Sequence, residues 1–218
     1  MIKEELRMEV FWLGHAAFKI ITNSGKIIYL DPFQLKKEPE KADIIIISHS
    51  HGDHFSNIDI KKLLKETTLL IGPESIATRL KKYNGKCLKI GDIFSIEDIK
   101  ITLFPAYTIN LQTHPKNNEW AGSIIETEGK IIYHAGDTEK IPEMKKLAKY
   151  NIDVAMLPCG GKYTMAFEEA CESAKDIKPK IVIPMHNWDL NLSEFKKIME
   201  QKDPNIKVEI LENKSLKL

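Results

Sequence analysis

The chain has 218 residues, of which 43% are hydrophobic and 29% are charged, so a packed core is expected and extensive disorder is excluded. Its 32 basic and 31 acidic side chains leave a formal net charge of +1, which is not the charge of a protein built to bind nucleic acid or an anionic membrane. The longest aliphatic run, residues 44–47, is far too short for a membrane span.

The N-terminal segment mixes acidic with basic residues and has no apolar stretch, so it lacks the pattern of a signal peptide. The three cysteines, Cys87, Cys159 and Cys171, form no CxxC pair and cannot make an even disulfide framework. We therefore expect a soluble cytoplasmic protein with one domain over residues 1–218, and homo-oligomerisation stays open.

A pentapeptide occurs twice in the chain, because residues 25–29 and 129–133 both read GKIIY. Each copy follows an apolar stretch and a polar turn, which is typical of the second strand of a β-hairpin. The two hairpins end near Asp31 and Asp137. Matching flanks predict two pseudo-equivalent halves, about 1–110 and 111–218.

Apolar runs rich in β-branched residues alternate with segments of helical periodicity along the rest of the chain. The strands expected from these runs are 44–48, 68–71, 99–104, 154–158 and 181–184. The expected helices are 59–65, 75–83, 142–150, 166–177 and 192–201. Hairpins combined with strand–helix units predict an α/β (α+β) protein with mixed sheets and outer helices, not an all-parallel sheet.

Four residues of metal-ligand type lie within six positions directly after the strand at 44–47. In an extended segment His49 and His51 point the same way, and Gly52 is expected to turn the chain so that Asp53 and His54 face a second position nearby. This spacing predicts two neighbouring metal centres. Imidazole and carboxylate ligands favour zinc, with manganese or iron admissible.

The HxHxDH motif at 49–54 resembles that of the metallo-β-lactamase superfamily, in the branch of small metal-dependent hydrolases that includes L-ascorbate-6-phosphate lactonase and N-acyl-phosphatidylethanolamine phospholipase D. Further stretches share this likeness: GH at 14–15, DP at 31–32, YHAGDT at 133–138, GGKYTM at 160–165 and PMHN at 184–187. The resemblance covers nearly the whole chain. It implies a four-layer αββα sandwich of two mixed sheets flanked by helices.

The same resemblance implies a set of metal ligands. It assigns one metal to His49, His51 and a third histidine, the other metal to Asp53, His54 and His186, and a bridging role to Asp137. The third histidine is expected to be His114, in the polar loop 108–118. His134 lies three residues before Asp137 and so faces the opposite way along a strand, where it either supports the site, faces the substrate or packs in the core.

Other residues are expected around these ligands. His15 either lines the cleft as a hydrogen-bond donor or serves a turn, and Asp31 either accepts a proton from a metal-bound histidine or caps a turn. Lys162 and Tyr163, beside two glycines at a helix start, either cradle an anionic substrate group or form an ordinary strand-to-helix turn. The tryptophans Trp12, Trp120 and Trp188 are expected to be core anchors more than a substrate platform.

These features favour a hydrolase in which a hydroxide bridging two divalent metals attacks an ester, lactone or phosphodiester of a small, anionic molecule. Asp53 is expected to be catalytic because it can both bind metal and orient that hydroxide. One alternative is a metal-dependent nuclease or phosphodiesterase acting on RNA or nucleotides, which the missing basic block between Asp137 and His186 disfavours. The other is a non-catalytic metal-binding module. Neither a membrane nor a nucleic-acid partner is expected.

Overall fold

The computed structural model describes residues 7–36 and 39–218. Residues 1–6, on which the expectation of no signal peptide partly rests, lie outside the described residues. In the part that is described, no helix combines the length and the apolar character that a bilayer span requires.

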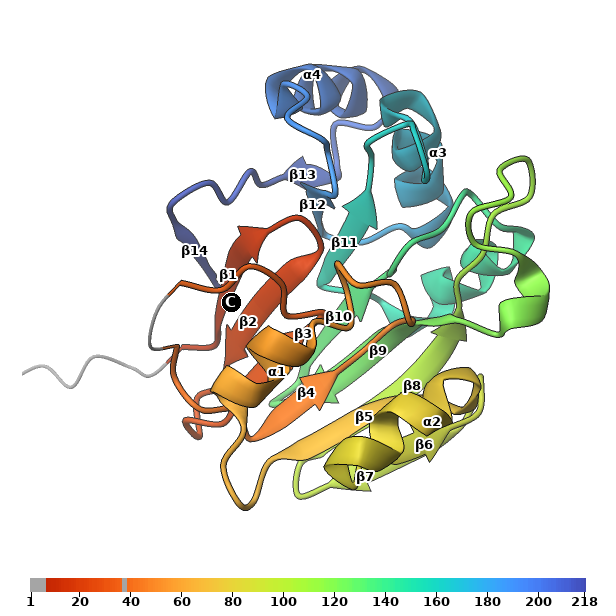
Figure 1. Ribbon diagram of the computed structural model, residues 1–218. Coiled ribbons are helices and arrows are strands. Elements are labelled where there is room, and N and C mark those ends of the chain that lie inside the picture. The colour runs from red at the N-terminus through yellow and green to blue at the C-terminus, as the bar shows by residue number, and fades with distance from the viewer. Residues whose placement is uncertain (1–6, 37–38) are drawn as a thin grey trace, which may run out of the picture.

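Within the described ranges, the centre of the molecule is a pair of seven-stranded sheets that face each other (Figure 1). The first sheet has the order β14-β1-β2-β3-β4-β5-β6, with strands β14 (Ser215–Lys217), β1 (Glu9–Gly14), β2 (Ala17–Ile21), β3 (Ile27–Leu30), β4 (Ile44–Ile46), β5 (Leu69–Pro73) and β6 (Lys86–Leu88). The second has the order β13-β12-β11-β10-β9-β8-β7, with strands β13 (Lys207–Val208), β12 (Ile181–Met185), β11 (Val154–Pro158), β10 (Lys130–His134), β9 (Ala121–Thr127), β8 (Ile99–Pro105) and β7 (Ile93–Ile96).

Both sheets are mixed in the same way. The chain pairs antiparallel through β14-β1-β2-β3 and β7-β8-β9-β10, and parallel through β3-β4-β5-β6 and β10-β11-β12-β13. The two GKIIY segments therefore lead into the fourth strand of each sheet. In both, the second isoleucine (Ile28, Ile132) packs between the sheets, while the tyrosine (Tyr29, Tyr133) packs under helices, as side-chain alternation requires.

Helices cover the outer face of each sheet, which confirms the expected four-layer sandwich of mixed sheets flanked by helices (Figure 1). The first sheet is covered by α1 (Asn57–Leu63) and by a segment that combines η1 (Glu74–Ile76), α2 (Ala77–Leu80) and η2 (Lys81–Tyr83). The second is covered by η4 (Pro142–Tyr150), α3 (Phe167–Ile177) and α4 (Leu192–Lys202). Three buried apolar clusters lie between these layers.

The boundary between the residues of the two sheets does not fall near residue 110 of the sequence. β7 and β8 precede residue 110 yet belong to the second sheet, while β14, at the far end of the chain, returns to pair with β1 of the first sheet. The expected helix at 75–83 is broken into short turns, and the one at 142–150 is a 3₁₀ helix. Outside the two sheets, η3 (Lys116–Asn118) forms one turn of the loop between β8 and β9.

The candidate ligands follow strands that end at one common edge. β3 and β4 run parallel in the first sheet, as do β10, β11 and β12 in the second. The carboxyl ends of the two sets meet, because His54 after β4 contacts Asp137 after β10, and Asp137 contacts His186 after β12. Because β1 and β2 are antiparallel, as are β8 and β9, the turn at His15 and the loop carrying His114 open at the same edge. Such an edge is where loops of α/β proteins form binding sites.

Candidate metal centre

His49, His51 and His114 form a first group of convergent imidazoles. Their ligand atoms lie within 4.8 Å of one another, and His49 Nε2 lies 3.1 Å from His51 Nδ1. The indole of Trp120 packs beneath all three, with ring-centroid distances of 4.8 Å to His49 and His51 and 5.5 Å to His114. The structure thus brings His114 to the motif, across 60 residues of sequence.

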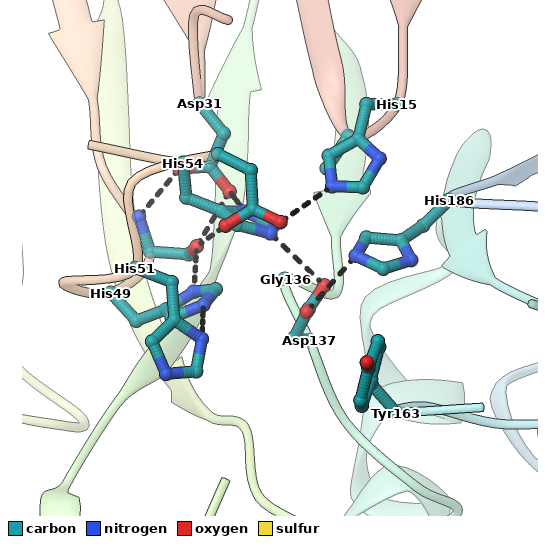
Figure 2. Close-up of polar contacts among 12 residues, drawn as sticks. His15, Asp31, His49, His51, His54, Gly136, Asp137, Tyr163 and His186 are labelled. Atoms are coloured by element: carbon teal, nitrogen blue, oxygen red, sulfur yellow. Dashed lines mark hydrogen bonds and ion pairs between the residues drawn. The ribbon is translucent and has the colours of Figure 1, made fainter. Parts of the chain in front are cut away.

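A second group contains His15, Asp53, His54 and His186, whose ligand atoms also lie within 4.8 Å of one another (Figure 2). His15 Nε2 lies 3.0 Å from Asp53 Oδ2, and the backbone N–H of His186 donates to the carbonyl of His15 at 3.0 Å. His15 was expected only to line the cleft as a donor or to serve a turn. Its ring nitrogen is positioned as a further candidate ligand.

Asp137 lies between the two groups (Figure 2). Its Oδ2 is 3.1 Å from the Nε2 atoms of both His114 and His186, and its Oδ1 is 3.3 Å from His54 Nε2. Those three Nε2 atoms and Asp137 Oδ1 are buried and have no hydrogen-bond partner among the described residues. Buried polar atoms rarely remain unpaired, and imidazole and carboxylate donors facing one point fit divalent metal ions.

Asp31 and Ser48 fix the orientation of two of the histidine rings. Asp31 accepts hydrogen bonds from the backbone N–H of Ser48 at 2.7 Å, from the Ser48 hydroxyl at 2.5 Å and from His54 Nδ1 at 2.7 Å. Because the Ser48 hydroxyl donates to Asp31, its oxygen accepts from His49 Nδ1 at 2.9 Å. The Nε2 atoms of His49 and His54 are thereby directed into the centre, the arrangement that metal-binding histidines adopt.

Burial and charge set the protonation of the cluster. Burial holds the pKa of His49 well below its usual value and also lowers the pKa of His51, so both rings are neutral and able to bind a cation. Burial alone would raise the pKa of Asp137, but the facing His54 and His186 hold it well below its usual value. For Asp53 burial is likewise outweighed, mainly by the His15 hydrogen bond, and its pKa is lowered to about 2.

The backbone is strained where it carries these side chains. His15, Asp31 and His186 have φ values of 51°, 43° and 52°, in the left-handed region that non-glycine residues seldom adopt. The position of Gly136 requires glycine, because its φ is 63° and a Cβ there would lie 3.0 Å from Ser48 Cβ. The chain turns at residues 52–54 as expected, and the N–H of His54 donates to the carbonyl of His51 at 3.1 Å. The turn does not require glycine, because the φ of Gly52 is not left-handed and a Cβ there would meet open space.

Glu139 is a support that the sequence analysis did not identify. This buried carboxylate accepts the backbone N–H groups of Ile109 at 2.5 Å, Asn110 at 2.6 Å and Leu111 at 3.5 Å. The backbone of Thr108 then pairs with that of His114 at 2.7 Å. The segment after Asp137 thus holds the loop that carries His114, and the only sequence signal is an acidic residue directly after the GDT run.

Tyr163 lies on the His186 side of the cluster (Figure 2), and Lys162 is its neighbour in the chain. The Lys162 ammonium is 4.9 Å from the Tyr163 ring centroid, and the Tyr163 carbonyl accepts a hydrogen bond from the Thr113 hydroxyl at 3.1 Å. The glycine turn is less open than expected, because the N–H of Gly161 donates to the carbonyl of Met165. The helix that follows begins only at Phe167.

The remaining predicted residues are placed as follows. His134 is buried, its Nε2 donates to the Ala16 carbonyl at 2.9 Å, and its Nδ1 accepts from the Gly136 N–H at 3.3 Å, so it joins the turn after His15 to the segment before Asp137. Trp188 was expected to be a core anchor but is 46% exposed beside the second group.

Comparison with known proteins is consistent with this geometry. Residues 9–186 match the family model of the beta-lactamase superfamily domain. A metal-dependent hydrolase of Pelotomaculum thermopropionicum is 34% identical over 213 residues, which cover 88% of this chain and 92% of that protein. A crystal structure classed among metal-dependent hydrolases, from Parabacteroides distasonis, has a TM-score of 0.85 at 36% identity, covering 93% of this chain and 92% of the other. Igni18, a metallo hydrolase of Ignicoccus hospitalis, gives 0.82 at 27% identity over 97% and 98%.

Proposed function

This chain belongs to the metallo-β-lactamase superfamily and is a metal-dependent hydrolase, and from that premise we propose that it uses two divalent ions to hydrolyse an ester, lactone or phosphodiester bond in a small, anionic molecule. Zinc is the ion we favour, because the donors are imidazoles and carboxylates. We propose His49, His51 and His114 as ligands of one ion, Asp53, His54 and His186 as ligands of the other, and Asp137 as the bridge.

The observation that carries the two-ion proposal is the position of Asp137. One oxygen lies 3.1 Å from a histidine of each group, and the facing nitrogens have no hydrogen-bond partner among the described residues. A carboxylate with two oxygens can serve two cations, and a single ion would leave part of this buried set unsatisfied. Two of the groups of convergent donors, one with His49, His51 and His114 and one with His15, Asp53, His54 and His186, share no residue, which supports two metal positions.

The two ions would supply a water of lowered pKa and would polarise the carbonyl or phosphoryl group under attack. The chain's own residues supply the rest. Asp53, whose pKa of about 2 keeps it ionised at neutral pH, is one-third exposed and can accept a proton from that water. His15, hydrogen-bonded to Asp53 at 3.0 Å, holds the carboxylate in place. Lys162 and Tyr163 offer a cation and a hydroxyl to an anionic group of the substrate.

Metal content and the Asp53→Asn variant test the chemical part of this proposal. We expect two zinc ions per chain by elemental analysis after purification without chelator. A general base contributes about 100- to 10,000-fold, so Asp53→Asn should lower kcat by at least about 100-fold while the free energy of unfolding changes little. Asp92→Asn, in the exposed turn before β7, is the matched control. A variant that unfolds, or one that retains full activity, would contradict the role of Asp53.

Lys162→Ala tests the anionic substrate. The neutral ester para-nitrophenyl acetate and its anionic counterpart para-nitrophenyl hemisuccinate share one leaving group, so they differ mainly in charge. We expect a higher KM for the anionic ester and no change for the neutral one. Lys149 lies 5.2 Å from the Tyr150 ring centroid, a similar lysine–tyrosine contact, and Lys149→Ala should change neither KM. Equal effects of Lys162→Ala on both esters would refute an anion site at this lysine.

We also propose that the chain works in the cytoplasm on a small molecule, with no nucleic-acid partner. The cysteines are free, and the formal net charge is only +1. Both features support this placement. Fractionation of cells expressing the tagged chain would test it, and recovery of the protein outside the cytoplasmic fraction would refute it.

A further inference from the structure

Trp188 lies beside the metal centre with an indole that is 46% exposed. It follows the candidate ligand His186 by two residues in the loop after β12. Its ring centroid is 5.3 Å from His186, 5.4 Å from His15 and 5.7 Å from Tyr163. At the other end of the centre, Trp120 packs against the first group of histidines but is only 8% exposed. Of these two tryptophans, one is therefore buried behind ligands and the other is open to the solvent.

The surrounding chain is shaped to hold Trp188 in this position. A Cβ on Gly160 would lie 2.4 Å from Trp188 Cδ1 and 2.4 Å from the His186 carbonyl, so only glycine fits beneath the indole. Trp188 and Asp189 both have left-handed φ values, 47° and 61°. Strain of this kind persists only where the surrounding structure enforces it, and it is concentrated at functional sites.

A cation completes this part of the site. The Lys162 ammonium lies 4.9 Å from the Tyr163 ring centroid and 6.0 Å from that of Trp188. The indole is therefore near both this ammonium and the histidines His186 and His15, so a ligand that contacts both can also contact the indole. The exposed face of an indole is flat and apolar, and aromatic rings pack well against it.

We infer that Trp188 determines specificity by stacking on a flat aromatic ring of the substrate, so that the substrate class is an aryl-bearing anion and not a purely aliphatic one. This inference rests on the proposed function, because the ring must belong to a ligand of the metal centre. Trp188 acts here as a binding surface and takes no part in bond cleavage.

Two non-hydrolysable anions test the inference without turnover. Phenylphosphonate and methylphosphonate carry the same anionic group and differ in the aromatic ring. Their dissociation constants are measured by calorimetry on the zinc-loaded protein and on Trp188→Leu, Trp188→Phe and Leu190→Ala. Leu190 is the matched control, since it lies in the same loop, is also 46% exposed and has no aromatic ring. Zinc content is measured in each variant, because Trp188 touches two candidate ligands.

We expect the wild type to bind phenylphosphonate about tenfold more tightly than methylphosphonate, the scale of one aromatic contact with its buried area. Leu190→Ala and Trp188→Phe should keep most of this preference, whereas Trp188→Leu should reduce it to less than about threefold with zinc content unchanged. An equal preference in Trp188→Leu, or no binding of either phosphonate by the wild type, would overturn the inference. A ring preference that depends on Trp188 in a protein that hydrolyses no ester, lactone or phosphodiester would uphold it and refute the proposed hydrolysis instead.

Discussion

Removing the Glu139 carboxylate should weaken one metal position without unfolding the protein. Glu139→Ala takes away the acceptor for the N–H groups of Ile109 and Asn110, at 2.5 and 2.6 Å, and so frees the loop that ends at His114. His49 and His51 come from another loop, after β4, and do not depend on this contact. The perturbation is therefore directed at the third histidine of one group.

The magnitude follows from the bonds that are lost. Hydrogen bonds to a charged group contribute about 1.5–3 kcal/mol each, but Ile109 is 57% exposed, so water replaces part of the loss. We expect the metal-free protein to lose about 2–3 kcal/mol in total. Residues that support metal ligands typically change metal affinity by about 10- to 100-fold, and we expect that range for the ion at His114.

Titration with zinc against a chromophoric chelator measures both sites, and urea unfolding of the metal-free protein measures stability. Glu128→Ala is the control, because Glu128 also accepts two backbone N–H groups, those of Asn23 and Ser24 at 2.7 and 2.9 Å, at the opposite end of β9 from the His114 loop. Glu139→Gln should largely rescue zinc affinity, since the amide oxygen can replace the accepting carboxylate oxygen. If Glu139→Ala weakens both zinc positions equally, or neither, Glu139 does not position His114.

Three further outcomes are expected. Asp31→Asn should lower zinc affinity by about 10- to 100-fold in the same titration, because the histidine that donates to Asp31 loses its charged acceptor. Burial alone would raise the pKa of Asp59, but hydrogen bonds from Lys62 and other donors outweigh burial and lower this pKa below its usual value. The ionised carboxylate therefore stabilises the fold above about pH 4, and this stabilisation is lost progressively as the pH falls. Urea unfolding of Asp59→Asn should show a smaller loss of stability between about pH 5 and pH 2 than the wild type, and an unchanged loss would contradict this. Burial raises the pKa values of all three cysteines, but Cys159 and Cys171 are fully buried and Cys87 is not. Iodoacetamide at about pH 8 should therefore modify Cys87 first, as peptide mass mapping would show.

The part of the fold that follows from local pattern was predictable. Strong apolar runs such as 154–158 and 181–184 became β11 and β12, and hairpins combined with strand–helix units indicated mixed sheets under outer helices, as found. The edge strands were not predictable, because β6, β13 and β14 are two or three residues long and have no readable periodicity. Their places depend on pairing partners, and β14 pairs with β1 across almost the whole chain.

The candidate site also has a part that the sequence predicts and a part that it does not. The residues 49–54 could be identified because four ligand types lie together, whereas His114, Asp137 and His186 depended on the family resemblance and on chain order. Glu139 accepts hydrogen bonds from a loop about 30 residues earlier in the chain, and Trp188 packs against Gly160, also about 30 residues away. No local sequence pattern encodes contacts at this separation. The likeness to the lactonase and the phospholipase stays a prediction.

The candidate ligands are divided between the sheets, since those at 49–54 follow β4 of the first sheet while His114, Asp137 and His186 follow strands of the second. An ion held by both sets would cross-link the two sheets. Because such an ion binds only the folded chain, it shifts the folding equilibrium toward the folded state by mass action. The temperature of unfolding should therefore rise with free zinc concentration. Substitutions between the sheets, as at Ile101, should then be detected as faster zinc release before any secondary structure is lost.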